Sequence, residues 1–354
     1  MKVLDTTAGL DWHDLVRLPD EELERLDIAA VNVACAAGLP GCSEPTPATV
    51  LQTIDGWTAQ CRRFTDRVMP MLRSGRSDYP ESEPKFRIQA LITHLQRDLG
   101  VRYHPGRMLD AAVFEPRDSF LQGIFTSEGG TCGSMPVLYT AVGRRLGYPL
   151  ELATTKRHLY CRWDDGAGEA FNIEGAGEGI SFFPDEHYRT GRYEMSVQTV
   201  EACGYLVSHS AREALAGFLV QRGECWRQER NYNEALTAYA WAHELAPVWN
   251  QVPILLSQGL RLWDNALHAR LPAWGFPKLD LGIPAPQFRH LSRNAEKDII
   301  RMRVMEGLLN DPAYERRWWK PLRSNPGVRP LGLPDVLRIN YRWNRPGRAP
   351  ALNA

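Results

Sequence analysis

The first 110 residues or so carry apolar positions at three- and four-residue spacing. The pattern occurs in three stretches, at 20–39, 47–72 and 83–100, which proline and glycine separate. Residues three and four apart share one face of an α-helix, so this spacing predicts amphipathic helices. A further short helix is expected over 114–125. We therefore expect a helical N-terminal region over residues 1–110.

A glycine-rich stretch then changes the pattern. "GGTCGSMPVLYTAVGRRLGYP", residues 129–149, sets Cys132 among three glycines and continues with apolar residues at helix spacing as far as Gly147. Glycine often ends a helix, because it adopts the left-handed conformation that a C-cap needs. The stretch predicts a helix that begins at or beside Cys132.

Short strand-like stretches follow this helix, at 149–155, 157–163 and 169–175. An Asp-Gly pair at 165–166 separates the last two and indicates a hairpin. A helix followed by an antiparallel sheet predicts an α+β core, which we place at 111–205.

From about Ser208 the pattern is helical again, and residues 215–247 resemble a tetratricopeptide repeat. A single repeat cannot bury its own apolar face, so we expect flanking helices from 252–271 and 295–309, within a helical region over 206–312. The residues at the repeat's packing positions are Leu219, Gly223, Trp226, Ala235, Tyr239, Ala242 and Pro247.

The last segment, 313–354, is basic. From Glu315 onward it holds eight arginines and one lysine against two acidic residues, a net charge of 9 − 2 = +7, with Trp318, Trp319, Tyr341 and Trp343 interleaved. Such a tail can bind phosphates and stack bases, or it can anchor itself on its own domain. We favour the second reading, so nucleic acid is a disfavoured partner.

The composition is that of an ordinary folded protein, with 44% hydrophobic and 24% charged residues among 354. Forty-two basic residues balance forty-two acidic ones, so no overall charge selects nucleic acid or an acidic membrane. The seven cysteines are odd in number and form no CxxC pair, which favours a reducing compartment over a disulfide framework. The chain has no signal-peptide pattern and no apolar run of about 18 residues, so we expect a cytoplasmic protein without membrane attachment.

Cys132 is the candidate nucleophile. A catalytic cysteine reacts as the thiolate, and the unpaired N–H groups and dipole of a helix N-terminus favour that charge. We expect the neighbouring glycines to let a substrate carbonyl approach the backbone, where the Cys132 N–H would bind the developing oxyanion.

His158 is the candidate base, 26 residues after Cys132 and at the start of a predicted strand. A hairpin centred on Gly166 would place His158 opposite Glu174, which would orient the imidazole. A bulge or a shift of two residues would place Asn172 opposite instead, so Asn172 is the alternative orienter. Cys132, His158 and Glu174 would then act as nucleophile, general acid and base, and orienting group.

The stretch from "GTCGSMPVLYTAVG" through "RHLYCRW" to "FNIEG" resembles the transglutaminase-like superfamily of papain-like thiol enzymes. Those enzymes carry a cysteine at a helix start and a histidine and an aspartate on adjacent strands. The resemblance covers about 114–188 most clearly and implies the same three roles for Cys132, His158 and Glu174, with glutamate where the family more often has aspartate.

The preceding helices resemble those of a bacterial branch that often adds tetratricopeptide repeats. The resemblance also implies a second oxyanion donor upstream of the cysteine, and Gln122 is the nearest amide side chain.

The sequence therefore predicts thiol-dependent acyl transfer or hydrolysis at an amide bond of a peptide or protein substrate. Water as acceptor gives hydrolysis, and an amine gives crosslinking. Neither a cofactor nor a metal is expected, since no residues have metal-ligand spacing. The main alternative is a noncatalytic scaffold of the same fold that binds a protein partner through the helical repeats.

Overall fold

The computed structural model describes residues 10–74, 82–107, 115–126, 128–177, 179–190 and 193–268. Its residues divide into two compact units, Met1–Cys225 and Trp226–Ala354, which we describe one at a time. The basic segment 313–354 and the expected helix at 295–309 lie outside the described residues. The domain limits at 110, 205 and 312 stay predictions.

The region before the sheet is helical, as the apolar spacing predicted. Helix α3 is buried along its whole length, and the N-terminal helices lie beside it. The elements are α1 (Trp12–Leu15), α2 (Asp20–Leu23), α3 (Ile28–Ala36), α4 (Pro47–Arg73), α5 (Glu83–Thr93), the π-helical turn η1 (His94–Asp98), the 3-10 turn η2 (Pro105–Arg107), α6 (Pro116–Ser119) and the 3-10 turn η3 (Leu121–Phe125).

Side-chain caps define where the two main N-terminal helices start. The carboxylate of Asp27 accepts hydrogen bonds from the N–H groups of Ala29 and Ala30 and begins α3. Thr46 caps α4 in the same way, with proline at the first helical position. Helix α4 then buries one face, at positions three or four residues apart: Val50, Ile54, Thr58, Cys61, Thr65 and Met69.

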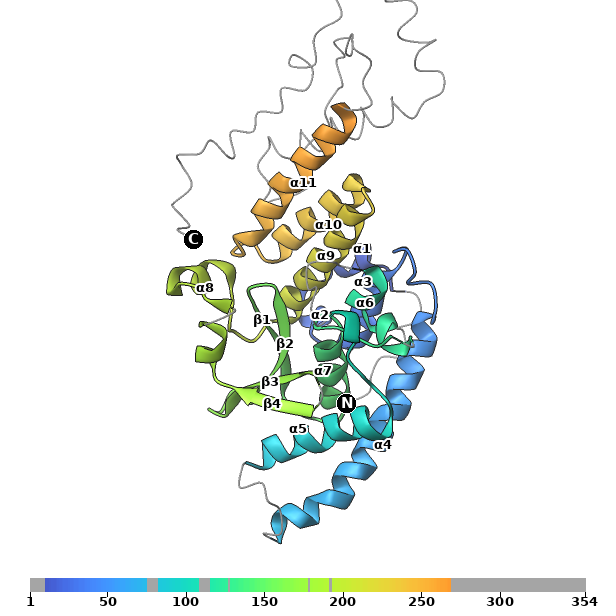
Figure 1. Ribbon diagram of the computed structural model, residues 1–354, viewed down its shortest axis with the longest axis vertical. Coiled ribbons are helices and arrows are strands. Elements are labelled where there is room, and N and C mark those ends of the chain that lie inside the picture. Colours follow the sequence, from blue (N-terminus) through green and yellow to red (C-terminus); the bar gives the residue numbers. More distant parts are fainter. Residues whose placement is uncertain are drawn as a thin grey trace, which may run out of the picture. The chain divides into compact units, whose positions relative to one another are not determined.

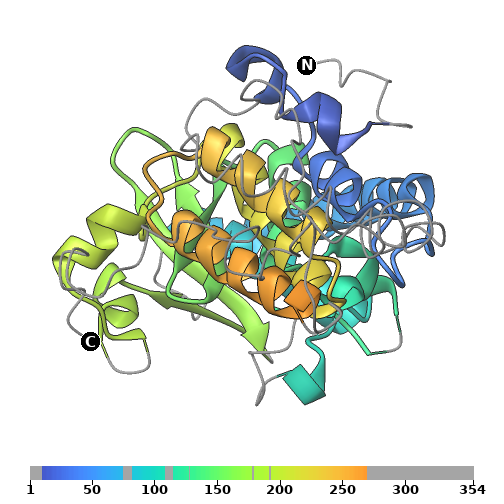
Figure 2. The ribbon, with the colours of Figure 1, turned by 90° about the horizontal axis from the view of Figure 1, so that it is seen from above.

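The core consists of one helix on a four-stranded antiparallel sheet, which confirms the α+β prediction. Helix α7 spans Met135–Arg145, and the strands are β1 (Leu150–Thr155), β2 (His158–Asp164), β3 (Ala170–Gly177) and β4 (Gly179–Phe183), in the order β1-β2-β3-β4. Sequence reasoning identified the first three strands and missed β4. Figures 1 and 2 both place the N-terminal helices (blue) on one side of this sheet and the yellow-green segment after β4 on the other.

The hairpin between β2 and β3 has a different register from the predicted one. Cys161 pairs with Ile173 and Asp164 with Ala170, so the turn is centred on Ala167 instead of Gly166. The Asp165 carboxylate causes this shift, because it accepts hydrogen bonds from the N–H groups of residues 167, 168 and 169 and closes a longer loop than a two-residue Asp-Gly turn. Every pair moves by two positions, and each side chain keeps its face of the sheet.

Beyond β4 the chain covers the other face of the sheet. The 3-10 turn η4 (Asp185–Tyr188) and α8 (Val197–Cys203) lie there. A buried cluster joins this segment to the sheet; its core is Ala153, Tyr160, Tyr188 and Leu206. Helix α9 (Ala211–Gln228) follows and returns to the N-terminal helices, where Arg222 donates to the carbonyls of Cys35 and Ala37.

In the second unit, α10 (Tyr232–Leu245) packs on α11 (Gln251–His268). A Cβ at Gly259 would lie 2.9 Å from Leu236, so glycine permits the close approach of these two helices. Helices occur where the repeat pattern placed them, and the tetratricopeptide assignment itself stays a prediction. Within the described ranges, no helix combines the length and the apolar character needed to cross a membrane.

Gly175 of β3 tests how closely α7 packs on the sheet. A Cβ there would lie 2.5 Å from the ring of Tyr139, which is buried in α7. We expect Gly175→Ala to lower the free energy of unfolding by about 2 kcal/mol, since the ring or the strand must move. Gly56→Ala on α4 is the control: nothing lies near its Cβ position, so it should stabilise the helix by up to about 1 kcal/mol. Denaturant unfolding measures both, and equal effects would contradict the close packing.

Candidate active site

Cys132 lies in the turn that leads into α7 and is partly buried. The helix begins three residues later, at Met135, and Ser134 is its N-cap residue. The thiol therefore lies beside the positive end of an eleven-residue helix, as the sequence predicted.

Backbone hydrogen bonds leave one N–H of this turn unused. The hydroxyls of Ser134 and Thr131 accept from the N–H groups of Thr131 and Gly133, and the carbonyl of Thr131 accepts from those of Ser134 and Met135. Across the described ranges, no group accepts from the N–H of Cys132. A carbonyl oxygen bound at the sulfur would find this donor ready.

The glycines around Cys132 do not make room for a substrate, which corrects our expectation. Gly129 has φ +99°, and a Cβ there would lie 2.4 Å from the carbonyl oxygen of Arg102. The reason is a close parallel pairing of two segments, in which Gly130 donates to Arg102 and accepts from His104. The absence of a side chain at Gly129 therefore makes room for the protein's own backbone.

The segment α6–η3 closes over the same turn. A Cβ at Gly130 would lie 2.8 Å from Ile124, and one at Gly133 would lie 3.1 Å from the carbonyl oxygen of Ser119. Gln122 lies between these two contact residues, is fully buried, and has no hydrogen-bond partner for either atom of its amide within the described chain. Burying an amide without hydrogen bonds costs free energy, so we expect a bound ligand or a water molecule to be the hydrogen-bond partner of Gln122.

His158 and Glu174 meet on the sheet. The imidazole Nε2 lies 2.6 Å from the Glu174 Oε1, and the two side chains are 11% and 16% exposed. In the observed register Glu174 falls opposite Tyr160, so it reaches His158 diagonally across the strands. The two residues are thus brought together, although the pairing expected from the sequence is wrong by two positions.

Asn172, the alternative orienter, has other partners. Its amide oxygen accepts from Arg162, and its nitrogen donates to the carbonyl of Phe183 and to the carboxylate of Asp185, at 2.8 Å. Of the two candidates on β3, Glu174 is therefore the one hydrogen-bonded to His158.

The electrostatics of His158 favour the imidazolium. Burial lowers the pKa of this histidine, but interactions with the side chains of Cys132 and Glu174 raise it more, from 6.5 to about 9. The ring is therefore charged at neutral pH. Because Glu174 occupies Nε2, Nδ1 is the nitrogen left to exchange a proton with Cys132.

Three tyrosines that sequence reasoning missed surround the imidazole. The ring centroids of Tyr160, Tyr188 and Tyr193 lie 6.2, 6.5 and 5.5 Å from that of His158. Tyr188 also donates a hydrogen bond to Glu174 Oε1 at 2.7 Å. Tyr188 and Tyr193 follow β4 in a stretch without helix or strand periodicity, so the sequence offers no signal for them.

His104, Asp118 and Glu128 place ligand atoms within 4.8 Å of one another, the geometry of a candidate cation site. The Asp118 carboxylate, however, already bonds the guanidinium of Arg107 at 2.7 Å. The N–H of Gly106 donates to His104 Nδ1, which leaves the proton on the Nε2 that faces Glu128. Asp118 and Arg107 form an ion pair, and His104 Nε2 lies 3.3 Å from the Glu128 carboxylate, so we assign these groups no metal.

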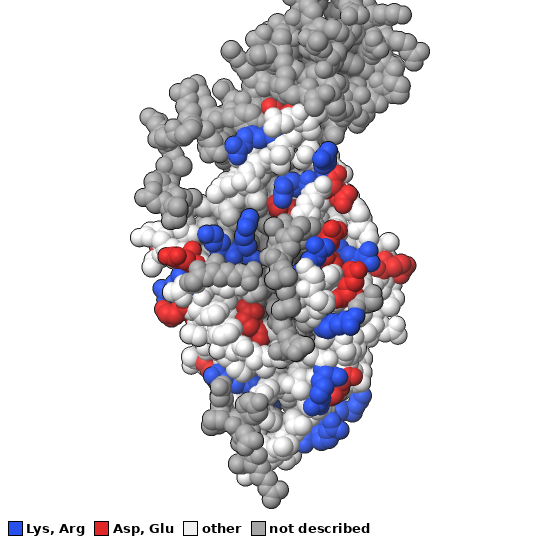
Figure 3. Space-filling model, in the orientation of Figure 1, with Lys and Arg blue, Asp and Glu red and all other residues white. Residues whose placement is uncertain are grey.

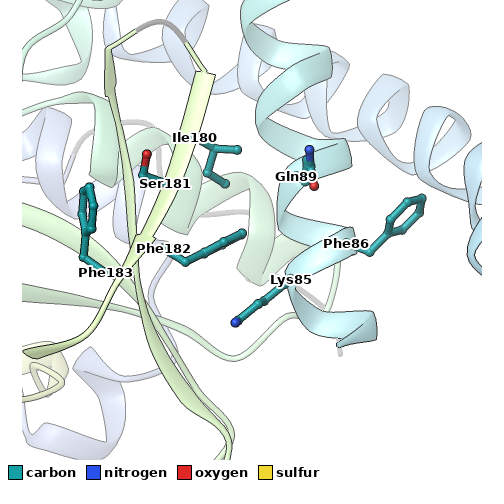
Figure 4. Close-up of a pocket in the computed structure, with 7 residues that line it drawn as sticks. All are labelled: Lys85, Phe86, Gln89, Ile180, Ser181, Phe182 and Phe183. Atoms are coloured by element: carbon teal, nitrogen blue, oxygen red, sulfur yellow. The ribbon is translucent and has the colours of Figure 1, made fainter. Parts of the chain in front are cut away.

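A surface pocket of about 390 Å³ lies between α5 and β4 (Figure 4), and its lining is Lys85, Phe86, Gln89, Ile180, Ser181, Phe182 and Phe183. Ile180 and Phe182 point toward α5, whereas Ser181 lies on the other side of β4. Ser181 pairs with Glu174, and paired residues share a face, so Glu174 projects away from the pocket. The pocket is therefore separate from the cysteine–histidine site.

On the face in Figure 3, acidic and basic side chains are interspersed among the described residues. This face therefore gives no reason to prefer a charged partner.

Comparison with known proteins agrees with this geometry. Residues 49–216 match the model of a family described as the transglutaminase-like superfamily. The match covers a little under half of the chain, and it includes all the site residues above. No curated protein and no solved structure matches the chain.

The raised pKa of His158 predicts a pH-dependent stability. The stabilisation is complete below pH 6.5 and is lost as the pH rises through about 9, because the folded state holds this proton more tightly than the unfolded chain. We expect the free energy of unfolding to fall across this window by up to about 3 kcal/mol, at about 1.36 kcal/mol for each pKa unit. Denaturant unfolding at several pH values measures this, with His158→Gln as control. Parallel profiles for the two proteins would contradict the prediction.

Proposed function

We propose that this protein is a thiol enzyme that transfers or hydrolyses acyl groups at amide bonds of a peptide or protein substrate. Cys132 is the nucleophile, His158 the general acid and base, and Glu174 the group that orients the imidazole. The observation that carries the proposal is the placement of His158, which bonds Glu174 through Nε2 and interacts with the Cys132 thiol at a helix N-terminus.

The first half-reaction forms a thioester. The Cys132 sulfur attacks the amide carbonyl carbon, and the carbonyl electron pair moves onto oxygen. The free N–H of Cys132 and the amide N–H of Gln122 stabilise this oxyanion. His158 then gives its Nδ1 proton to the nitrogen of the scissile bond, the carbon–nitrogen bond breaks, and the amine leaves.

The second half-reaction releases the acyl group. Neutral His158 takes a proton from water or from an amine, which attacks the thioester carbon as the carbon–sulfur bond breaks. Water gives the carboxylic acid and an amine gives a new amide; the sulfur returns as the thiolate beside the imidazolium. The same three side chains thus serve hydrolysis and transamidation.

Selective alkylation of Cys132 tests the proposal. We expect iodoacetamide to label Cys132 at about pH 7 at least tenfold faster than Cys203, the other partly buried cysteine, as located by mass spectrometry. The remaining cysteines are an internal control, because they are buried and burial raises the thiol pKa of Cys35, Cys42, Cys61, Cys161 and Cys225 to about 12.

His158→Ala should remove the advantage of Cys132 and leave the labelling of Cys203 unchanged. If Cys132 instead reacts like Cys203 in the wild type, the noncatalytic scaffold becomes the better interpretation. A peptide-amide screen with water or added amines as acceptors would follow a positive result.

Gln122 is proposed as the second oxyanion donor. We expect Gln122→Ala to lower kcat by about 10²-fold on any peptide amide that the wild type turns over, because one donor to the oxyanion is lost. The alkylation rate of Cys132 should stay the same, since alkylation develops no oxyanion. Gln89→Ala on α5 is a matched control. An unchanged kcat in Gln122→Ala would show that the donor lies elsewhere.

A further inference from the structure

Glu174 is one methylene longer than aspartate, so its carboxylate has an additional rotatable bond to restrain. The structure supplies that restraint through Tyr188. The Tyr188 hydroxyl lies 2.7 Å from Glu174 Oε1, the same oxygen that lies 2.6 Å from His158 Nε2. An ionised carboxylate can only accept, so the phenol is the donor.

We propose that Tyr188 is a positioning residue whose hydroxyl holds the Glu174 carboxylate against the His158 imidazole. This inference rests on the proposed function of Cys132, His158 and Glu174. Tyr188 touches neither the substrate nor the sulfur in this role; it acts through Glu174.

The Tyr188 ring is fixed well enough to set a position. It is fully buried and stacks on Tyr160, with ring centroids 4.4 Å apart and planes 8° from parallel. Ala153 and Leu206 complete the cluster around it. A ring packed in this way has one rotamer available, so its hydroxyl has a fixed position. The flexible Glu174 side chain hydrogen-bonds to the hydroxyl at that position.

The turn that carries Tyr188 is itself fastened to the sheet. Tyr188 ends η4, and Asp185 begins it. The Asp185 carboxylate accepts from the amide of Asn172 and from the guanidinium of Arg162, at 2.8 and 2.9 Å. Asn172 and Glu174 are two residues apart on β3 and share a face, so one strand holds both ends of η4. Asn172 therefore contributes to the site indirectly, by holding the turn that carries Tyr188.

The hydroxyl keeps its proton over the whole working pH range. Burial, followed by the charge of Glu174, raises the pKa of Tyr188 far above its ordinary value of 10. Tyr188 thus remains a donor wherever Glu174 is ionised.

Tyr188→Phe in the full chain removes only this donor and keeps the ring. We expect the pKa of His158, followed by NMR of its imidazole, to fall from about 9 toward 6.5, because the released carboxylate moves off Nε2. Alkylation of Cys132 at about pH 7 should slow several-fold. Among the described residues, the titratable groups that face the imidazole are Cys132, Glu174, Tyr160, Tyr188 and Tyr193.

Tyr160→Phe is the matched control, since it removes a hydroxyl from the stacked neighbour that makes no hydrogen bond with Glu174; the His158 pKa should stay near 9. A His158 pKa that stays near 9 or rises in Tyr188→Phe would overturn the proposal. Such a result would mean that other contacts hold the Glu174 carboxylate in place and that the Tyr188 hydroxyl only hydrogen-bonds to it.

A double-mutant cycle separates positioning from general packing. In a Glu174→Ala background, Tyr188→Phe should change the His158 pKa no further, because its effect passes through the carboxylate. An equal change in both backgrounds would overturn the proposal. If Tyr188→Phe does not fold, Asp185→Ala is the second variant. It keeps Tyr188 but removes the contacts that hold η4 to β3, so it should lower the His158 pKa by less than Tyr188→Phe. An unchanged His158 pKa in Asp185→Ala would count against the proposal.

The NMR titration reports on Tyr188 even if Cys132 proves unreactive. Failure of the proposed function and failure of the positioning role therefore give different results.

Discussion

The packing of α7 against the sheet is the constraint on which the site depends. Cys132 precedes α7, whereas His158 and Glu174 come from β2 and β3, so the three meet only if the helix has one position on the strands. The hydroxyl of Tyr139 donates to the carbonyl of Gly175, and Thr140 lies within hydrogen-bonding distance of the Cys161 sulfur. Gly175 directly follows Glu174, so the helix is held to β3 beside the residue that is hydrogen-bonded to His158.

Electrostatic balance is the second constraint. Removing an imidazolium from water is costly, and burial alone would keep His158 neutral. The charged form is retained because Glu174 and Cys132 flank the ring, while Tyr188 completes the hydrogen bonding of the carboxylate. The same interactions bind the ring tightly, so the predicted pH dependence of stability and the proposed reactivity of the thiol both depend on one buried cluster.

The sequence identifies the α+β core, three of the four strands and the two residues that form the central hydrogen bond, His158 and Glu174. These features are local: helix and strand periods, a cysteine before a helix, and the parity that puts two residues on one sheet face. The register of the β2–β3 hairpin was not predictable in the same way, because it depends on how many backbone N–H groups of the loop hydrogen-bond to the Asp165 carboxylate.

Tertiary contacts account for what else the sequence did not reveal. The glycines beside Cys132 are small because Arg102, Ile124 and Ser119 pack against them, and none of these neighbours adjoins them in the chain. Tyr188 reaches Glu174 from beyond β4, a strand that was itself missed. A hydrogen bond between residues 14 apart in an irregular stretch leaves no periodic trace.

The geometry around His158 also constrains the order of the proposed reaction. Glu174 occupies Nε2, and tyrosine rings lie around the imidazole, so Nδ1 is the nitrogen that exchanges protons in the proposed mechanism. The leaving amine and the incoming acceptor must each meet this nitrogen. They therefore use one position in turn, and the acceptor can enter only after the amine has left. The reaction is then a two-stage transfer through a thioester, and its outcome depends on whether water or an amine occupies the vacated position first.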